Sequence, residues 1–262
     1  MLHPLPSLAT TAAAVAVGLV MGLASDLSRL TLMAITMLMI QFSISVLNDW
    51  ADRGRDAVAG RAKPLVRGDV SPRLALSLAF LFAVGALPGA VAFGRTAGVV
   101  VLIGFLAGWA YDLWLSSTPL SFLPFAIAFP LLPIWVGLLA GRPLASLAWL
   151  ILAGAPLAIG IHLGDSLPDI ANDTTAGSRN LAVMLGPARS IGVIVGLLLI
   201  GALVVVIAVV SQAVLAVVVG VAALIAAWLV TNNRARPERV RWITGAYAIV
   251  ATLALVTHLP HG

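Results

Sequence analysis

Long runs of apolar residues, separated by short polar or Pro/Gly-containing breaks, occupy most of this chain. Nine runs can be marked off, each close to the roughly 20 residues that a helix needs to cross a bilayer. They cover residues 6–24, 28–50, 73–93, 97–115, 119–140, 145–165, 187–209, 212–231 and 241–258. The pattern predicts an all-α integral membrane protein, a bundle of about nine transmembrane helices that forms a single domain over residues 1–262.

Composition supports this class and excludes others. Of the 262 residues, 61% are hydrophobic and 10% are charged, which is too apolar for a soluble domain. The absence of cysteine excludes disulfides, zinc–thiolate sites and cysteine nucleophiles. The sequence pI of about 11.0 does not indicate nucleic-acid binding, because membrane proteins carry extra Lys and Arg in their cytoplasmic loops. The first run is predicted to be a retained helix, since no Lys or Arg precedes it and a second run follows directly.

The basic residues predict the orientation. All 15 Lys and Arg residues, except Arg29, Arg95 and Arg142, lie in the loops after the second, fourth, sixth and eighth runs. These loops and the N-terminus are therefore expected in the cytoplasm, and the C-terminus outside. We expect a bacterial or archaeal cell membrane.

The second run ends in a group of polar residues at positions 48–56. Asn48, Asp52 and Asp56 are spaced by four residues, so on a helix they form one stripe, each step advancing about 6 Å. Asp49 lies beside this stripe. A carboxylate near a membrane needs a compensating cation or water, because an Asp at a helix centre costs roughly 2.5–3.5 kcal/mol.

A second stripe of the same period ends the sixth run at positions 165–173, and consists of Asp165, Asp169 and Asp173. Two facing stripes of hard oxygen ligands, without cysteine, favour Mg²⁺, Mn²⁺ or Ca²⁺. The alternative is a solvated acidic helix end paired with basic residues, for which Arg53 and Arg55 are candidates.

Each acid motif is followed by a basic, glycine-containing loop. The first loop contains Arg61, Lys63 and Arg67, and the second contains Arg179. Such cations beside a metal site suit a highly charged anion such as diphosphate. The alternative is that they only mark the cytoplasmic side.

Together these motifs resemble the UbiA superfamily of intramembrane prenyltransferases. The resemblance rests on the ordered set of motifs at 48–56 and 165–173, the Lys63-Pro64-Leu65 loop that ends in Gly68, and the nine-segment plan. It implies a helical bundle around a central, lipid-accessible cavity, in which Mg²⁺ holds an isoprenyl diphosphate, ionisation gives an allylic cation and an acceptor is alkylated. It also implies metal-binding roles for matched positions: Asn48, Asp49, Asp52, Asp165 and Asp169. For Asp56 and Asp173 the resemblance implies one of two roles, either metal binding or orientation of the basic loop.

The fourth run ends in a segment with a departure from this family. Family members often carry lysine where this chain has Ser116, and that lysine would help to hold diphosphate. Arg179 or Lys63 could compensate. Tyr111 and Asp112 are candidates for the cavity or acceptor site, although Tyr111 also suits the membrane interface. His162, one turn before Asp165, is a further acceptor candidate or a hydrogen-bonded packing residue.

The predicted activity is thus Mg²⁺-dependent transfer of an isoprenyl group to an aromatic or lipid acceptor of unknown identity. A UbiA-like terpene cyclase or diphosphate lyase is an alternative. A divalent-cation transporter is a third hypothesis, opposed by the position of both acid motifs at helix ends instead of the membrane midplane.

Overall fold

The computed structural model describes residues 4–58 and 60–258, and these residues form helices and connecting turns without any strand. Nine long helices account for most of the chain: α1 (Pro4–Val20), α2 (Leu27–Val58), α4 (Pro72–Ala92), α5 (Arg95–Ala110), α6 (Leu123–Leu139), α8 (Leu150–Ser166), α10 (Leu181–Ala208), α11 (Ala213–Asn232) and α12 (Pro237–His258). The short elements are η1 (Leu23–Ser25), α3 (Pro64–Arg67), the π-helical turn η2 (Tyr111–Leu115), α7 (Leu144–Leu147), the 3₁₀ turn η3 (Leu167–Asp169) and α9 (Ile170–Thr175).

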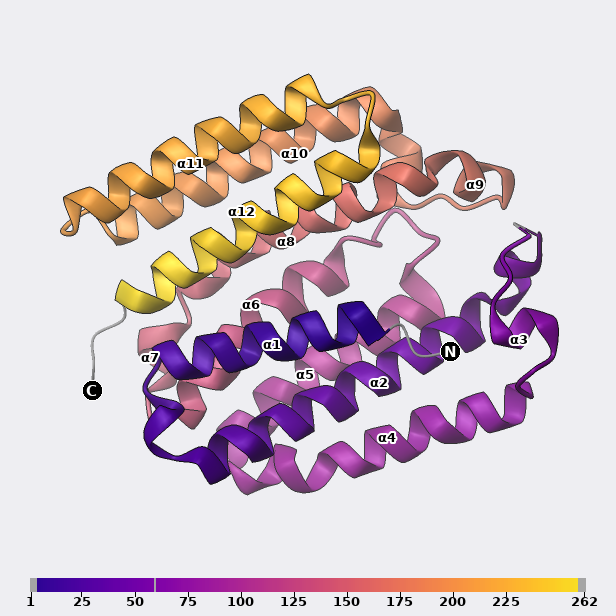
Figure 1. The fold of residues 1–262 in the computed structure, drawn as a ribbon, viewed down its shortest axis with the longest axis horizontal. Coiled ribbons are helices and arrows are strands. Elements are labelled where there is room, and N and C mark those ends of the chain that lie inside the picture. The colour runs from indigo at the N-terminus through magenta and orange to yellow at the C-terminus, as the bar shows by residue number, and fades with distance from the viewer. Residues whose placement is uncertain (1–3, 59, 259–262) are drawn as a thin grey trace.

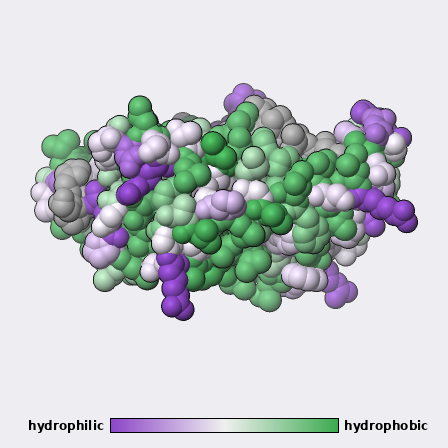
Figure 2. Space-filling view, turned by 90° about the horizontal axis from the view of Figure 1, so that it is seen from below, coloured by the Kyte–Doolittle hydropathy of each residue, from purple (hydrophilic) through white to green (hydrophobic). Residues whose placement is uncertain are grey.

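Seven described helical spans are long and apolar enough to cross a membrane, and the helices over Pro6–Val20 and Leu123–Leu139 are shorter apolar ones. This confirms the predicted multi-pass, all-α bundle of about nine membrane helices. The surface agrees with this reading. The face in Figure 2 is mostly hydrophobic, with hydrophilic residues mainly toward the ends of the long axis.

The helices run side by side along one direction (Figure 1). Along the chain, α2 packs against α4, α5 against α6, and α6 against α8, while α10 packs against both α8 and α11. The last helix, α12, contacts α8 and α11, and α1 contacts α2 and α6. Two short helices lie at the same end of the bundle (Figure 1): α3, which follows the first acid motif, and α9, which carries Asp173 of the second. This arrangement brings the two motifs together.

Local sequence signals explain where the helices near that end begin. Ser71 caps α4 by accepting a hydrogen bond from the Leu74 backbone N–H (3.2 Å), and Pro72 follows at the first helical position, where proline is well tolerated. In the same way, Asn180 Oδ1 accepts from the Val183 backbone N–H (2.9 Å) and caps α10. A kink interrupts α10 at Gly186, whose φ of +70° is a conformation that glycine adopts without strain.

Helices α2 and α4 approach each other closely at Gly89. A Cβ atom on Gly89 would lie 1.7 Å from Thr36 Oγ1 and 3.0 Å from Thr36 Cβ. We therefore expect Gly89→Ala to force the two helices apart and to lower the free energy of unfolding by about 1–3 kcal/mol. The measurement is the melting temperature of the purified protein in detergent.

Gly192→Ala in α10 is the matched control, because a Cβ there would meet no atom within 4 Å. It is expected to leave the melting temperature unchanged or slightly higher, since alanine is the better helix former. Equal melting temperatures for Gly89→Ala and the unmodified protein would contradict the close contact.

Candidate active site

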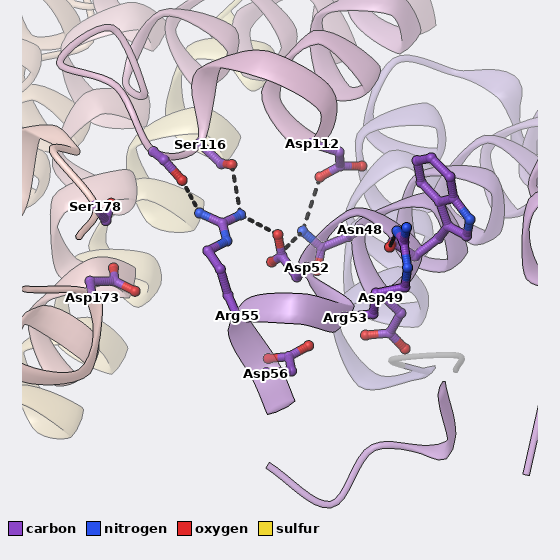
Figure 3. Close-up of polar contacts among 12 residues, drawn as sticks. Asn48, Asp49, Asp52, Arg53, Arg55, Asp56, Asp112, Ser116, Asp173 and Ser178 are labelled. Carbon is purple, nitrogen blue, oxygen red and sulfur yellow. Dashed lines mark hydrogen bonds and ion pairs between the residues drawn. The ribbon is translucent and has the colours of Figure 1, made fainter. Parts of the chain in front are cut away.

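The two acid motifs face each other at the end of the bundle that carries α3 and α9. Arg61, from the loop after α2, joins them: its Nη2 lies 2.6 Å from Asp169 Oδ1 and its Nη1 lies 3.4 Å from Asp56 Oδ1. Figure 3 shows the first motif on α2, with Asp173 on the opposite side. The sequence prediction of two facing motifs therefore holds in the structure.

The first motif lies on a continuous helix, because α2 extends past the apolar run to Val58. Its side chains point in two directions. Asn48 and Asp52 form one pair, with Asn48 Nδ2 3.4 Å from Asp52 Oδ2. Asp49 and Asp56, seven residues and about two turns apart, share the ammonium group of Lys63 at 2.7 and 2.9 Å. The predicted single stripe of Asn48, Asp52 and Asp56 is thus divided, with Asp56 on the Lys63 side.

Lys63 holds the basic loop against α2. Asp49 and Asp56 are nearly inaccessible, with side chains 2% and 3% exposed, and the Lys63 side chain is 18% exposed. Burial of the ammonium lowers the pKa of Lys63, but the hydrogen bonds to Asp49 and Asp56 outweigh it, so that the pKa lies above its usual value. Lys63 is therefore charged at neutral pH, and Asp56 orients the loop.

Asp112 brings a third element, the π-helical turn at the end of α5, next to the first motif. Its side chain is buried, and its Oδ1 accepts a hydrogen bond from Asn48 Nδ2 (3.1 Å; Figure 3). Its second oxygen, Oδ2, is buried without a hydrogen-bond partner. A buried polar atom in this state needs a compensating donor or cation.

Arg55 connects α2 to the turn after the π-helical segment. It donates hydrogen bonds to Asp52, to Ser117 Oγ and to Ser116 Oγ, the last at 3.0 Å (Figure 3). The family that this chain resembles often has lysine at the position of Ser116, and in this chain the Arg55 guanidinium lies against the Ser116 hydroxyl. A cation is therefore present at this point although Ser116 is neutral.

The second motif does not form the predicted helical stripe. Helix α8 ends at Ser166, a 3₁₀ turn covers Leu167–Asp169, and α9 begins at Ile170. Pro168 explains the break, because proline lacks the N–H that a helix needs and clashes with the preceding turn. The prediction of one continuous stripe is wrong here.

As a result, the three carboxylates of this motif have separate partners. Asp165 pairs with Arg241 of α12 (Nε to Oδ1, 2.9 Å), and Asp169 pairs with Arg61. Asp173 accepts a hydrogen bond from Asn180 Nδ2 (2.7 Å) and so supports the cap of α10. Of the three, Asp169 is joined directly to the first motif.

His162 and Tyr111 belong to an aromatic cluster behind the polar residues. The centroid of Phe125 lies 4.7 Å from that of His162 and 5.2 Å from that of Tyr111. A hydrogen bond joins His162 Nε2 to Ser121 Oγ (2.9 Å), which also accepts from the Leu181 backbone N–H (3.1 Å). His162 thus has the packing and hydrogen-bonding role that the sequence left as one of two alternatives.

An apolar cavity continues from this cluster. Phe129 stacks on Phe125, with centroids 5.4 Å apart, and lines a small cavity of about 50 Å³ between α6, α8 and α12. Pro130, Leu157 and Ala158 also line it. The aromatic cluster therefore leads from the neighbourhood of Asp112 into apolar space.

Two of the predicted diphosphate-binding residues lie on the exposed surface. Arg67 pairs with Asp69 (2.6 Å), and both side chains are about half exposed. Arg179 is exposed, and its backbone N–H donates to Ser117 O (2.9 Å). The structure places neither side chain among the contacts of the acid motifs.

Sequence reasoning named Arg55 as a candidate partner of the acidic residues, and it does pair with Asp52, but the contacts of Arg55 with Ser116 and Ser117 and the role of Arg241 were missed. A signal existed for Arg55, since it follows Asp52 by three residues and such residues are neighbours on a helix. Arg241 and Ser117 reach the motifs only through tertiary packing, so no local pattern indicated them.

The chemistry of the site fits a hard divalent cation such as Mg²⁺. Asn48, Asp52 and Asp112 offer carboxylate and amide oxygens, the ligands that Mg²⁺ prefers, and Asp112 Oδ2 lacks a hydrogen-bond partner. Among the residues that the structure describes, no three acidic or histidine side chains are gathered closely enough to hold one metal ion. Arg55 and Arg61 pair with Asp52 and Asp169, and these arginines would have to release the carboxylates for a metal to bind.

Comparisons with known proteins agree with this site and fold. The UbiA prenyltransferase family matches residues 7–257, so the chain belongs to that family. The bacteriochlorophyll synthase 33 kDa chain of Cereibacter sphaeroides is 31% identical over 157 residues, which cover 53% of this chain and 49% of that protein. The match thus spans about half the length of this curated relative.

Solved structures share the fold at low sequence identity. An apo UbiA homologue from Aeropyrum pernix K1 has a TM-score of 0.74 and 17% identity, covering 96% of this chain and 100% of that one. A UbiA homologue from Archaeoglobus fulgidus bound to GPP and Mg²⁺ has a TM-score of 0.70 and 19% identity, covering 97% and 95%. These similarities extend over nearly the whole bundle.

Proposed function

We propose that this protein transfers an isoprenyl group from an isoprenyl diphosphate to an acceptor within the membrane, and that the reaction requires Mg²⁺. The observation that carries the proposal is the site between the acid motifs, where Asn48, Asp52 and the partly unpaired Asp112 lie beside Arg55, and where Arg61 joins Asp56 to Asp169. Membership of the UbiA family supports it, as does the related structure bound to GPP and Mg²⁺.

The proposed metal-binding residues are Asn48, Asp52, Asp112 and Asp169. Bound Mg²⁺ would supply neutralisation of the negative charge that develops on a diphosphate leaving group. Asp49 and Asp56 are assigned instead to holding Lys63, and Asp165 to pairing with Arg241.

The cations and the apolar interior have complementary roles in this proposal. Arg61 and Lys63 would bind the diphosphate at the polar end, where charge-assisted hydrogen bonds are strong. The isoprenyl chain would lie against the aromatic cluster of Tyr111 and Phe125, and the small cavity beyond Phe129 would have to widen to receive it. Such an apolar enclosure excludes the water that would otherwise capture the reactive allylic group.

For the acceptor, we propose an aromatic or lipid molecule that enters from the bilayer. A screen would begin with precursors of bacteriochlorophyll, because one relative is a bacteriochlorophyll synthase.

We further propose that residues 1–262 form a single domain in a cell membrane. The site would face the cytoplasm, which is the side that the distribution of Lys and Arg residues predicts for both acid motifs.

The proposal predicts that Mg²⁺ and an isoprenyl diphosphate stabilise the protein together. A ligand that binds only the folded state raises the melting temperature, by an amount equivalent to about 2.7 kcal/mol at a hundred times its Kd. The measurement is thermal unfolding in detergent with GPP, with Mg²⁺ and with both. A clear increase is expected only with both.

The outcomes separate the hypotheses. Stabilisation by a divalent cation alone, accompanied by cation flux in liposomes, would favour the transporter alternative and contradict prenyl transfer. Product analysis after incubation with GPP but no acceptor tests the cyclase or lyase alternative, which alone predicts turnover of the donor under those conditions.

A further inference from the structure

Arg55 differs from the neighbouring cations, Arg61 and Lys63, in the groups that its side chain contacts. Lys63 is bound by two buried carboxylates, and Arg61 bridges one carboxylate from each motif. Arg55 contacts one carboxylate, Asp52, and two neutral hydroxyl groups, those of Ser116 and Ser117. Hydroxyls orient a guanidinium without neutralising its charge.

The position of Arg55 suits an incoming anion. Its side chain is 33% exposed, whereas that of its partner Asp52 is 20% exposed. In Figure 3 the Arg55 guanidinium lies between the first acid motif and the segment that carries Asp173 and Ser178. It is therefore in the space between the two motifs. Its planar set of N–H donors matches the oxygens of a phosphate group.

Asp52 is also a proposed metal ligand, and a carboxylate oxygen that binds a metal is no longer available to Arg55. Arg55 would then keep the two serine hydroxyls as its fixed contacts and turn the freed N–H donors to a phosphate oxygen. The hydroxyls keep the guanidinium from following Asp52.

We infer that Arg55, oriented by the hydroxyls of Ser116 and Ser117, binds the diphosphate group of the donor and exchanges Asp52 for phosphate when the metal-bound donor arrives. This inference rests on the proposed function. It assigns the diphosphate contact on this side of the site to a residue of α2 itself, inside the acid motif.

Isothermal titration of the purified full-length protein with GPP in the presence of Mg²⁺ tests the inference. Arg55→Ala is expected to weaken binding about 10- to 100-fold, the effect of losing a hydrogen bond to a charged group. Arg55→Lys keeps the charge but loses the planar fork, and an intermediate Kd is expected. Each variant's melting temperature without ligand shows whether it is folded.

Arg53→Ala is the matched control on the same helix. Arg53 is exposed, its guanidinium lies 4.6 Å from the centroid of the Trp50 ring, and it donates to the Trp50 carbonyl. Arg53→Ala removes the same charge as Arg55→Ala, two residues away. If the effect depends on the position of the Arg55 guanidinium and not on net charge, the Kd of Arg53→Ala for GPP should stay within about twofold of that of the unmodified protein.

A second-site rescue separates binding from a structural role. Ser116 Oγ lies 3.0 Å from the Arg55 guanidinium, so a lysine at position 116 would bring an ammonium to the same space. Arg55→Ala combined with Ser116→Lys is expected to recover most of the lost affinity, whereas a purely structural loss would not be recovered by the new cation.

The results are distinguishable from failure of the proposed function. If the unmodified protein binds no GPP with Mg²⁺, the prenyl-donor site itself is wrong, and the Arg55 assignment falls with it. If the unmodified protein binds GPP and folded Arg55→Ala binds it equally well, the Arg55 assignment alone is overturned.

Discussion

Replacement of Asp52 by alanine is expected to lower Mg²⁺-dependent prenyl transfer by about a thousandfold. Asp52 lies at the centre of the polar network, between Asn48 and Arg55, and contributes the half-buried carboxylate of the first motif. Its loss would remove a metal ligand and leave Arg55 without its carboxylate partner. Removing a single electrostatic contact to the reacting group commonly costs 10²–10³-fold, and loss of metal binding adds to this.

Turnover with a labelled isoprenyl diphosphate measures the effect, and Asp52→Asn provides an isosteric test. The asparagine keeps a hydrogen-bonding oxygen for Arg55 but lacks the charge, so the fold is retained while transfer stays low. Asp69→Ala is the matched control, because Asp69 is an exposed partner of Arg67 outside the proposed site. Activity of Asp52→Ala close to that of the unmodified protein would exclude the proposed metal site.

Lys63→Met is expected to cause the largest loss of stability among the substitutions considered. The ammonium of Lys63 is shared by two nearly inaccessible carboxylates. Removing one partner of a buried ion pair typically costs about 3–5 kcal/mol, and Arg61 retains a 3.4 Å contact to Asp56. We therefore expect about 3 kcal/mol, or a melting temperature lower by roughly 6–12 °C.

Arg67→Met is the control for this substitution, since it removes a cation from the same loop. Its ion pair with Asp69 is half exposed, and exposed pairs contribute about 0–1 kcal/mol.

The contribution of Lys63 to stability also depends on pH. Because the pKa of Lys63 is raised in the folded protein, this contribution is complete at neutral pH and is lost only in strongly alkaline solution, as pH rises through that pKa. Equal stability of Lys63→Met and Arg67→Met would contradict the buried cluster.

The sequence was sufficient for the helices and for the approximate site, because both depend on local patterns. Apolar length predicted the membrane spans, and the four-residue spacing predicted that the 48–56 motif lies on a helix. Contacts that cross the fold were beyond such patterns: the pairing of Asp165 with Arg241 joins α8 to α12. The break at Pro168 did have a local signal, since proline interrupts helices, and the regular spacing of Asp165, Asp169 and Asp173 concealed it.

The π-helical turn at Tyr111–Leu115 also affects how this segment can change in length. A π-turn accommodates one residue more than an α-helical turn, and here the Ser116 backbone N–H donates to the Tyr111 carbonyl, five residues earlier (2.9 Å). Because the wider turn absorbs the extra residue, deleting one residue here would restore α geometry with little rotation of the chain on either side. Such a deletion would therefore change the contacts of Asp112 and Ser116 with α2 before it changed the packing of α5.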